Sequence, residues 1–310
     1  MEDNLEEFIM VDDGSDEDVK SGFVGVVGEP NAGKSTLINW LVGEKIAMTS
    51  RKANATRKRL TAIVMYEDNQ IILIDTPGIH EKEKLLNKYM LNEALKVLGD
   101  SDLILYIADS RKDTKAYQKF LELNTKKIPH LLVLTKVDML KEEELKDKIA
   151  VYESLENKDY LELIPISSTM NINRDKLLST IVKYLPNHPY YFDPEIISTE
   201  NIKDIYKELI REAIFDKLND EIPYESDVII EKIIEKDDID KVYAMIVTQK
   251  DTQKSMIIGK KGKKIKELGI AARKLLEQFS GKKIYLELYV KTVPNWTKNK
   301  KMLEEIGYFE

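Results

Sequence analysis

Between Phe23 and about Leu185, short apolar runs alternate with amphipathic stretches. The apolar runs are FVGVVG, LTAIVMY, IILID, LILYIAD, HLLVLT and ELIPIS, and stretches of helical periodicity separate most of them. Short apolar runs are typical of buried strands, and a period near 3.6 is typical of helices that pack on them. The alternation predicts an α/β fold, a doubly wound and mostly parallel sheet with ligands at the carboxyl ends of its strands.

A different pattern follows the proline-containing stretch LPNHPYYFDPEIISTE, which breaks the periodicity and is typical of a linker. Beyond it the sequence predicts a helix, two strands, a short helix, the turn GKKG, a helix and a strand, which together form a smaller α+β domain. We therefore expect four segments: an acidic disordered leader (1–20), a nucleotide-binding domain (21–185), a linker (186–200) and a second domain with a C-terminal tail (201–310).

Composition supports two domains and excludes several classes of protein. A chain of 310 residues with 43% hydrophobic content can bury two cores. The chain has no Cys, which excludes disulfides and zinc sites built on thiolates. No apolar run reaches the roughly 18 to 20 residues of a membrane span, and the N-terminus is acidic rather than signal-like. These features predict a cytoplasmic protein.

Charge is distributed unevenly along the chain. Residues 1–20 hold nine Asp or Glu against Lys20, whereas residues 241–300 hold fifteen Lys or Arg against four acidic residues. Like charge and low apolar content predict that the leader is disordered. The basic excess near the C-terminus would attract a phosphate backbone in a salt-dependent way, although charge alone is also compatible with a solvated, lysine-rich face.

One stretch, from Gly28 to Ser35, satisfies the phosphate-loop pattern G-x-x-x-x-G-K-[ST] between a predicted strand and a predicted helix. Backbone N–H groups and the positive end of the helix can cradle phosphates there. We expect Lys34 to reach the β and γ phosphates and the Ser35 hydroxyl to bind Mg²⁺. The residues predicted to bind nucleotide here are Gly28, Glu29, Pro30, Asn31, Ala32, Gly33, Lys34, Ser35 and Thr36.

A second motif, Asp75-Thr76-Pro77-Gly78, follows the apolar run IILID, so it emerges at the same edge of the sheet. Asp75 can hold the Mg²⁺ shell through water, and the Gly78 N–H can meet the γ-phosphate. The next residue, Ile79, cannot orient a water molecule through its side chain, as a Gln does at this place in Ras-like enzymes.

Two further loops predict guanine recognition. In the motif Thr135-Lys136-Val137-Asp138, the Asp138 carboxylate can accept hydrogen bonds from guanine N1–H and the 2-amino group, which adenine does not offer in this arrangement. The usual first residue of this motif is Asn, and Thr135 keeps a hydroxyl but loses the amide. Ser167 and Ser168 follow the strand LELIPI, where a backbone N–H can meet the guanine 6-oxygen.

The segments GEPNAGKSTLIN, TSRKANATRKR, DTPG, TKVD and PISS resemble the Era family of GTPases. The resemblance implies a Ras-like G domain of the P-loop NTPase class, in which Thr56 binds Mg²⁺ in the GTP state. The family usually has a second Thr where this chain has Ala55. It also implies hydrolysis through positioning by Lys34, Thr56 and Gly78 with no side-chain base, and a K⁺ role for Asn31. Turn stabilisation is the alternative for Asn31.

The turn between the last two predicted helices is a G-x-x-G pattern, in which glycines let a nucleic-acid backbone approach closely. The residues predicted to bind RNA are Ile258, Gly259, Lys260, Lys261, Gly262, Lys263, Lys264 and Arg273. A plain helix connection is the alternative for two glycines at this spacing. The element order matches a type II KH domain, and the stretch through KIYLELYVKTVPNW is similar to Era. Tyr285, Tyr289 and Trp296 are either base-stacking or core residues.

The resemblance implies a GTPase that binds GTP or GDP and the single-stranded 3′ end of 16S ribosomal RNA on assembling 30S subunits. An RNA-binding scaffold with a hardly hydrolysing G domain is the alternative. A GTPase of tRNA modification would need a further catalytic domain. We expect a monomer, and the family also implies peripheral contact with the inner face of the cell membrane.

Overall fold

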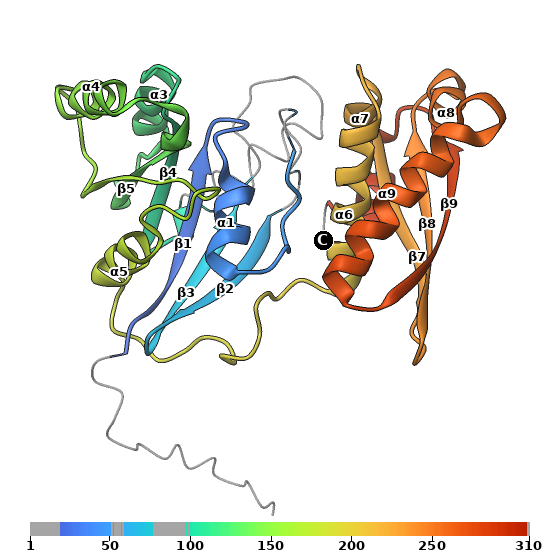
Figure 1. The fold of residues 1–310 in the computed structure, drawn as a ribbon, viewed down its shortest axis with the longest axis horizontal. Helices are drawn as coiled ribbons and strands as arrows, with labels where there is room; N and C mark the ends of the chain where they lie inside the picture. The colour runs from blue at the N-terminus through green and yellow to red at the C-terminus, as the bar shows by residue number, and fades with distance from the viewer. Residues whose placement is uncertain are drawn as a thin grey trace, which may run out of the picture.

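The computed structural model describes residues 19–50, 52, 57, 59–76, 97 and 99–308. Residues 1–18, which make up most of the predicted leader, therefore lie outside the described residues, as do Thr56 and the stretch 77–80. The described residues form a sheet of six strands and a separate sheet of three strands (Figure 1).

The larger sheet has the strand order β2-β3-β1-β4-β5-β6. Its strands are β1 (Ser21–Gly28), β2 (Leu60–Tyr66), β3 (Asn69–Asp75), β4 (Leu103–Asp109), β5 (His130–Thr135) and β6 (Leu163–Pro165). Only β2 is antiparallel to its neighbour, and the other four pairs are parallel. Strands β4 and β5 are buried at every position, as apolar strands covered on both faces must be.

Helices cover both faces of this sheet. They are α1 (Lys34–Val42), α3 (Lys115–Leu123), α4 (Glu142–Glu153) and α5 (Arg174–Tyr184). Leu37 of α1 and Leu177 of α5 share one core, whereas Tyr117 of α3 and Tyr152 of α4 lie in another. Successive residues of β4 alternate between the two cores, so the helix pairs lie on opposite faces. This confirms the predicted doubly wound sheet.

The parallel pairing brings the candidate nucleotide residues to one edge. Strands β1, β3, β4 and β5 end at Gly28, Asp75, Asp109 and Thr135, and their carboxyl ends meet because these strands run in the same direction. Helix α1 begins at Lys34, directly after the loop that leaves β1. The phosphate loop, the aspartate motif and the TKVD motif therefore converge in space.

The smaller sheet has the order β7-β8-β9, in which β8 is antiparallel to β7 and parallel to β9. Its elements are α6 (Ile202–Lys217), α7 (Ile222–Glu225), β7 (Ser226–Ile234), β8 (Ile239–Thr248), α8 (Asp251–Ile258), η2 (Lys260–Gly262), α9 (Lys263–Ser280), β9 (Lys283–Thr292), η3 (Trp296–Lys298) and α10 (Lys300–Ile306). This confirms the predicted α+β unit with a basic turn between two helices.

The two faces of the smaller sheet are covered by different parts of the chain. Apolar residues of α6 and α9, such as Leu209 and Leu268, share a core with Val242 of β8. On the opposite face, Trp296 and Leu303 from the C-terminal segment pack on Met245 and Val247. The C-terminal tail is thus an integral layer of this unit.

The stretch 186–200 runs along the edge of the larger sheet, as the yellow-green trace below β2 and β3 in Figure 1 shows. The Gln70 side chain donates to the Phe192 carbonyl (2.7 Å) and accepts from the Tyr191 and Phe192 N–H groups (2.9 and 3.1 Å). The Ile63 N–H donates to the Ile197 carbonyl (2.9 Å). The stretch 186–200, which joins the two domains, is therefore hydrogen-bonded to the larger sheet.

Candidate functional site

The phosphate loop has the backbone that its glycines allow. Gly33 has a φ of 103°, a conformation that residues with a side chain rarely adopt, and it caps the N-terminus of α1. At Gly28 a Cβ atom would lie 2.3 Å from the Ile107 carbonyl oxygen, so only glycine fits beside β4. The loop N–H groups and the start of α1 therefore lie together, in an arrangement that could surround an anion.

Lys34 is buried within this loop. Its side chain is 7% exposed, and Nζ donates to the Gly28 and Glu29 carbonyls, both at 3.0 Å. Burial lowers the pKa of this ammonium group, and the nearby Asp75 carboxylate opposes the shift. The charge is held at the centre of the loop, within reach of an anion that the loop would bind.

Ser35 and Asp75 lie together at the start of α1. The Ser35 hydroxyl donates to Asp75 Oδ2 at 2.9 Å. Asp75 is 1% exposed, and within the described residues its Oδ1 atom has no hydrogen-bond partner. Burial raises the pKa of this carboxyl group to about 6, although Lys34 and Ser35 lower it. A buried carboxylate oxygen without a partner, beside a serine hydroxyl, fits the oxygen ligands that Mg²⁺ prefers.

Thr135 links the phosphate loop to the neighbouring strand. Its hydroxyl lies 2.6 Å from the Ala32 carbonyl oxygen and 3.1 Å from the Ala108 carbonyl oxygen, and the residue is 4% exposed. The hydroxyl therefore tethers the loop to β4. The sequence identified Thr135 as a departure from Asn but did not predict this structural role.

The rest of the TKVD motif presents one acidic side chain to solvent. Lys136 has a φ of 60°, and its Nζ donates to the Asn31 carbonyl and to Asp109 Oδ2. Val137 is buried, and its N–H donates to the Ile166 carbonyl (3.3 Å). Asp138 is exposed on a short 3-10 helix, Val137–Met139. A ligand at this edge would meet the Asp138 carboxylate.

The serines after β6 shape the adjoining loop. Ser167 is fully buried, and its hydroxyl accepts from the Met170 N–H at 3.1 Å. Ser168 is half-buried beside it. The Ser167 and Ile172 backbones bond to each other in both directions, which closes the loop into a tight turn. This turn lies next to Val137, so the two predicted base-side loops are neighbours.

Sequence reasoning missed an acidic residue at the same edge, Asp109. Arg111 donates to it from Nε (2.9 Å) and Nη2 (2.7 Å), and Lys136 donates at 2.9 Å. Burial by itself would raise the pKa of Asp109, but these bonds lower it well below its ordinary value. Asp109 orients Lys136, and the signal in the sequence was an acidic residue at the end of the apolar run LILYIAD.

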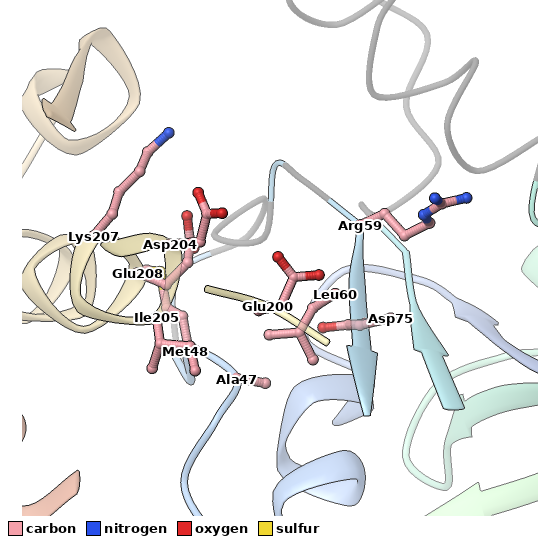
Figure 2. Close-up of a pocket in the computed structure, with 10 residues that line it drawn as sticks. All are labelled: Ala47, Met48, Arg59, Leu60, Asp75, Glu200, Asp204, Ile205, Lys207 and Glu208. Atoms are coloured by element: carbon pink, nitrogen blue, oxygen red, sulfur yellow. The ribbon is translucent and has the colours of Figure 1, made fainter. Parts of the chain in front are cut away.

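A cavity at this edge is lined by Asn31, Lys34, Ser35, Lys136 and Arg111, among other residues. A second cavity lies beside Asp75, between the two sheets. Figure 2 shows the acidic side chains of α6 opposite Asp75 there. Thr56, Pro77, Gly78 and Ile79, which the sequence assigned to nucleotide and Mg²⁺ binding, lie outside the described residues.

The GKKG turn has a tight backbone that depends on its glycines. Gly259, Lys261 and Gly262 all have positive φ, at 70°, 53° and 76°. A Cβ atom on Gly259 would lie 2.9 Å from the Lys264 side chain, so the turn requires glycine there. Helix α9 starts at Lys263 without a side-chain cap, which leaves its first N–H groups available to a phosphate.

Most of the predicted RNA-binding side chains lie in or next to this turn, and Arg273 lies further along α9. Lys260, Lys261, Lys263, Lys264 and Arg273 are all exposed, and Ile258 is half-buried at the end of α8. The three aromatic candidates differ in burial. Trp296 is fully buried and belongs to the core, whereas Tyr285 and Tyr289 are 47% and 41% exposed.

Comparison with known proteins identifies both units. The family model described as 50S ribosome-binding GTPase matches residues 23–136, and the KH domain model matches residues 209–297. GTPase Era of Helicobacter pylori (strain HPAG1) is 45% identical over 294 residues, covering 93% of this chain and 97% of that protein. GTPase Era of Campylobacter concisus (strain 13826) is 46% identical over 291 residues, covering 94% and 100%.

Two crystal structures are similar over nearly the whole chain. A variant of Aquifex aeolicus Era bound to GDP and aluminium fluoride has a TM-score of 0.88 and 31% identity, covering 94% of this chain and 100% of that one. Era in complex with MgGDPNP and nucleotides 1506–1542 of 16S ribosomal RNA has a TM-score of 0.86 and 32% identity, with the same coverage. The fold, the two domain matches and the identity to curated relatives show that this chain belongs to the Era family of GTPases.

Proposed function

We propose that this chain binds and hydrolyses GTP and binds the single-stranded 3′ end of 16S ribosomal RNA during 30S subunit assembly. Nucleotide chemistry is assigned to residues 21–185 and RNA binding to residues 201–310, which the stretch 186–200 joins. The observation that carries the proposal is the convergence of Lys34, Ser35 and Asp75 at the edge where the phosphate loop meets α1. The solved complex of a similar Era with MgGDPNP and 16S ribosomal RNA supports it.

In the proposed nucleotide site, each residue acts on the phosphates or the metal. Lys34 exchanges its bonds to the Gly28 and Glu29 carbonyls for bonds to the β and γ phosphates. Ser35 and Asp75 would hold Mg²⁺, which supplies charge neutralisation when bound, with Asp75 acting through water. By the family resemblance, Thr56 completes this set and the Gly78 N–H binds the γ-phosphate.

Hydrolysis in this proposal rests on positioning and charge neutralisation rather than on a side-chain base. Ile79 stands where Ras-like enzymes have a Gln, so the water must be oriented by other groups. Lys34 and the phosphate-loop N–H groups neutralise charge that develops on the transferred phosphoryl group. Slow intrinsic turnover follows, and K⁺ bound near Asn31 is the proposed activator.

Guanine selectivity is assigned to Asp138. The Thr135 hydroxyl is already bonded to the Ala32 and Ala108 carbonyls, so it holds the loop rather than the base. The exposed Asp138 carboxylate can pair with guanine N1–H and the 2-amino group, and a site built for this pair rejects adenine. Ser167 and Ser168 place the loop that would meet the guanine 6-oxygen.

RNA binding is assigned to the GKKG turn and the start of α9. The glycines permit close approach of about four nucleotides, and the exposed lysines supply charge for the phosphates. Sequence readout would come from bases that lie between this turn and the sheet. Tyr285 and Tyr289 are exposed on β9, but Tyr289 is in register with Met245, so both tyrosines lie on the face of the sheet opposite α9.

Competition experiments test the proposal. Purified protein is titrated with a fluorescent GTP analogue in MgCl₂ with excess ATP or GTP as competitor, and separately with an oligonucleotide of the 16S 3′ end. We expect competition by GTP and not by ATP, together with RNA binding that weakens as salt rises. Effective competition by ATP would contradict the role of Asp138. Tight GTP binding without any turnover in KCl or NaCl would favour the RNA-binding scaffold.

The proposal also includes K⁺ activation, peripheral membrane contact and a monomeric state. None of the helices in the described ranges is both long enough and apolar enough to cross a membrane. A comparison of GTP turnover in KCl and in NaCl tests K⁺ activation. Flotation with anionic lipid vesicles tests membrane contact, and light scattering of the purified protein tests the monomeric state.

A further inference from the structure

The nucleotide cavity is closed on one side by the KH unit. Its lining includes the phosphate-loop residues Lys34 and Ser35 and, from helix α6, Glu212, Phe215 and Asp216. Helix α6 lies on the side of the KH unit that faces α1 and β2 (Figure 1). A carboxylate-bearing helix from the RNA-binding unit therefore forms a wall of the proposed GTP site.

Specific bonds hold this wall in place. Glu212 accepts from the Thr49 N–H (3.0 Å), the Thr49 hydroxyl (3.3 Å) and Lys45 Nζ. Its side chain is only 12% exposed, and Met48 and Phe215 form a buried apolar contact beside it. Glu212 thus pairs with Lys45, just before the residues Met48, Thr49 and Ser50 that line the cavity.

A buried arginine fixes the same segment to the next strand of the KH unit. Arg57 is 3% exposed, and its Nη1 donates to Asp227 Oδ2 at 2.8 Å and to the Ser226 carbonyl at 3.0 Å. Nη2 donates to the Pro223 and Tyr224 carbonyls, at 3.1 and 2.8 Å. These Arg57 bonds join the two units and hold α7 and the start of β7, which follow α6 in the chain, against the larger domain.

The acidic residues of α6 are regularly spaced. Glu200, Asp204, Glu208, Glu212 and Asp216 recur every four residues, which places them on one face of the helix and the turn before it. Glu212 and Asp216 line the nucleotide cavity, and the other three line the cavity beside Asp75 (Figure 2). We call these five residues the acidic stripe.

We propose that the acidic stripe is an electrostatic brake on nucleotide binding, an inference that rests on the proposed GTP site. The carboxylates of Glu212 and Asp216, which line the cavity, raise the free energy of a bound phosphate chain. GTP carries one more negative charge than GDP, so the stripe disfavours GTP more. Movement of α6 away from the cavity would release the brake.

Charge-neutral variants test this brake. Glu212→Gln keeps an oxygen that can accept from Thr49 but removes the charge. Asp216→Asn changes a side chain that is 67% exposed and pairs with Lys217, so it leaves the packing of α6 intact. Glu143→Gln, on the exposed surface of α4, is the matched control. The readout is the Kd of the full-length protein for GDP and for GTP with MgCl₂, at low and at high salt.

We expect the double variant to bind GTP about three- to tenfold more tightly than wild type at low salt, with a smaller gain for GDP. The gain should shrink at high salt, because screening acts on charge and not on shape. Asp216→Asn alone should show part of the gain, and Glu143→Gln should show none.

If wild type binds GTP but neither acidic-stripe variant binds it more tightly, the brake is contradicted and the proposed GTP site is not. A gain that persists at high salt would also overturn the brake, because it would indicate a change in shape. Failure of every protein, wild type included, to bind either nucleotide would contradict the proposed function itself.

Discussion

The two candidate sites are built in opposite ways. At the nucleotide edge, three polar side chains are buried or half-buried and bonded to the protein: Lys34 to loop carbonyls, Ser35 to Asp75 and Thr135 to two carbonyls. At the GKKG turn the charged groups are exposed around a strained backbone, with Lys260 and Lys261 facing solvent.

This difference determines how each site responds to amino-acid substitution. A buried polar group that loses its partner leaves an unmet hydrogen bond in a region of low dielectric, so single substitutions at the nucleotide edge should have large effects. An exposed lysine contributes mainly through counterion release, so substitutions at the turn should be additive and salt-dependent. Substitutions at the two sites should therefore differ in the size of their effect and in its dependence on salt.

The largest effect is expected at Lys34. Lys34→Ala removes the one buried cation of the phosphate loop and should lower kcat for GTP hydrolysis by about 10²- to 10³-fold. Lys112→Ala is the matched control, because Lys112 reaches the same loop at the Pro30 carbonyl (3.5 Å) from an exposed position. Steady-state hydrolysis assays of both variants make the comparison. Equal losses in the two would show that burial is not what distinguishes Lys34.

A smaller effect is expected at Thr135. Thr135→Val removes the hydroxyl that bonds the Ala32 and Ala108 carbonyls and should lower the free energy of unfolding by about 1–2 kcal/mol. GTP affinity should fall with it, because the loop loses its tether. Thr135→Ser keeps the hydroxyl and should retain most of the stability and most of the GTP affinity. Urea denaturation and GTP titration measure the effects, and full stability of the Val variant would refute the tether.

At the GKKG turn we expect a moderate, salt-dependent loss. Changing Lys260 and Lys261 together to Ala should weaken binding of the 16S 3′-end oligonucleotide about tenfold. The plot of log affinity against log salt should become shallower by about 1.4, since each contact with single-stranded RNA contributes about 0.7. The exposed α3 pair Lys115 and Lys119, both changed to Ala, is the control. An unaltered salt slope would remove these lysines from the RNA site.

The smallest effect at neutral pH is expected at His130, a buried residue whose ring nitrogen bonds the Tyr117 hydroxyl (2.8 Å). Burial lowers the pKa of His130 to about 4 from 6.5, so the unfolded chain binds the extra proton first as pH falls. Its contribution to stability is fully present above pH 6.5 and is lost towards pH 4, by about 1.4 kcal/mol at pH 5.5. His130→Gln should flatten the stability profile in this window, and urea midpoints from pH 7 to 5 measure it. An unchanged slope would contradict the assignment to His130.

Local patterns predicted most of the fold and most of the residues that gather at the nucleotide edge. The phosphate loop and the GKKG turn are contiguous, so their residues and spacing are visible directly in the sequence. Strand direction then places Asp75 and Thr135 beside Gly28, because parallel strands share one edge. The doubly wound sheet followed by a KH domain was therefore predictable.

Contacts between distant segments were not predictable. The bond from Lys136 to Asp109 and the contact of Glu212 with Thr49 depend on packing that no local pattern encodes. The four-residue spacing of acids in α6 was visible, but the surface that it faces was not. Likewise, the sequence could not show that Trp296 is buried while Tyr285 on β9 is exposed, because the burial of Trp296 depends on the packing of the C-terminal segment against the sheet.

The most direct test of the account is single-turnover hydrolysis of GTP by the full-length protein in KCl and MgCl₂, with and without the 16S 3′-end oligonucleotide. We predict hydrolysis that the oligonucleotide accelerates, and no acceleration when Lys260 and Lys261 are both changed to Asp. Hydrolysis that is indifferent to the oligonucleotide, while the protein demonstrably binds it, would contradict a functional link between the two sites.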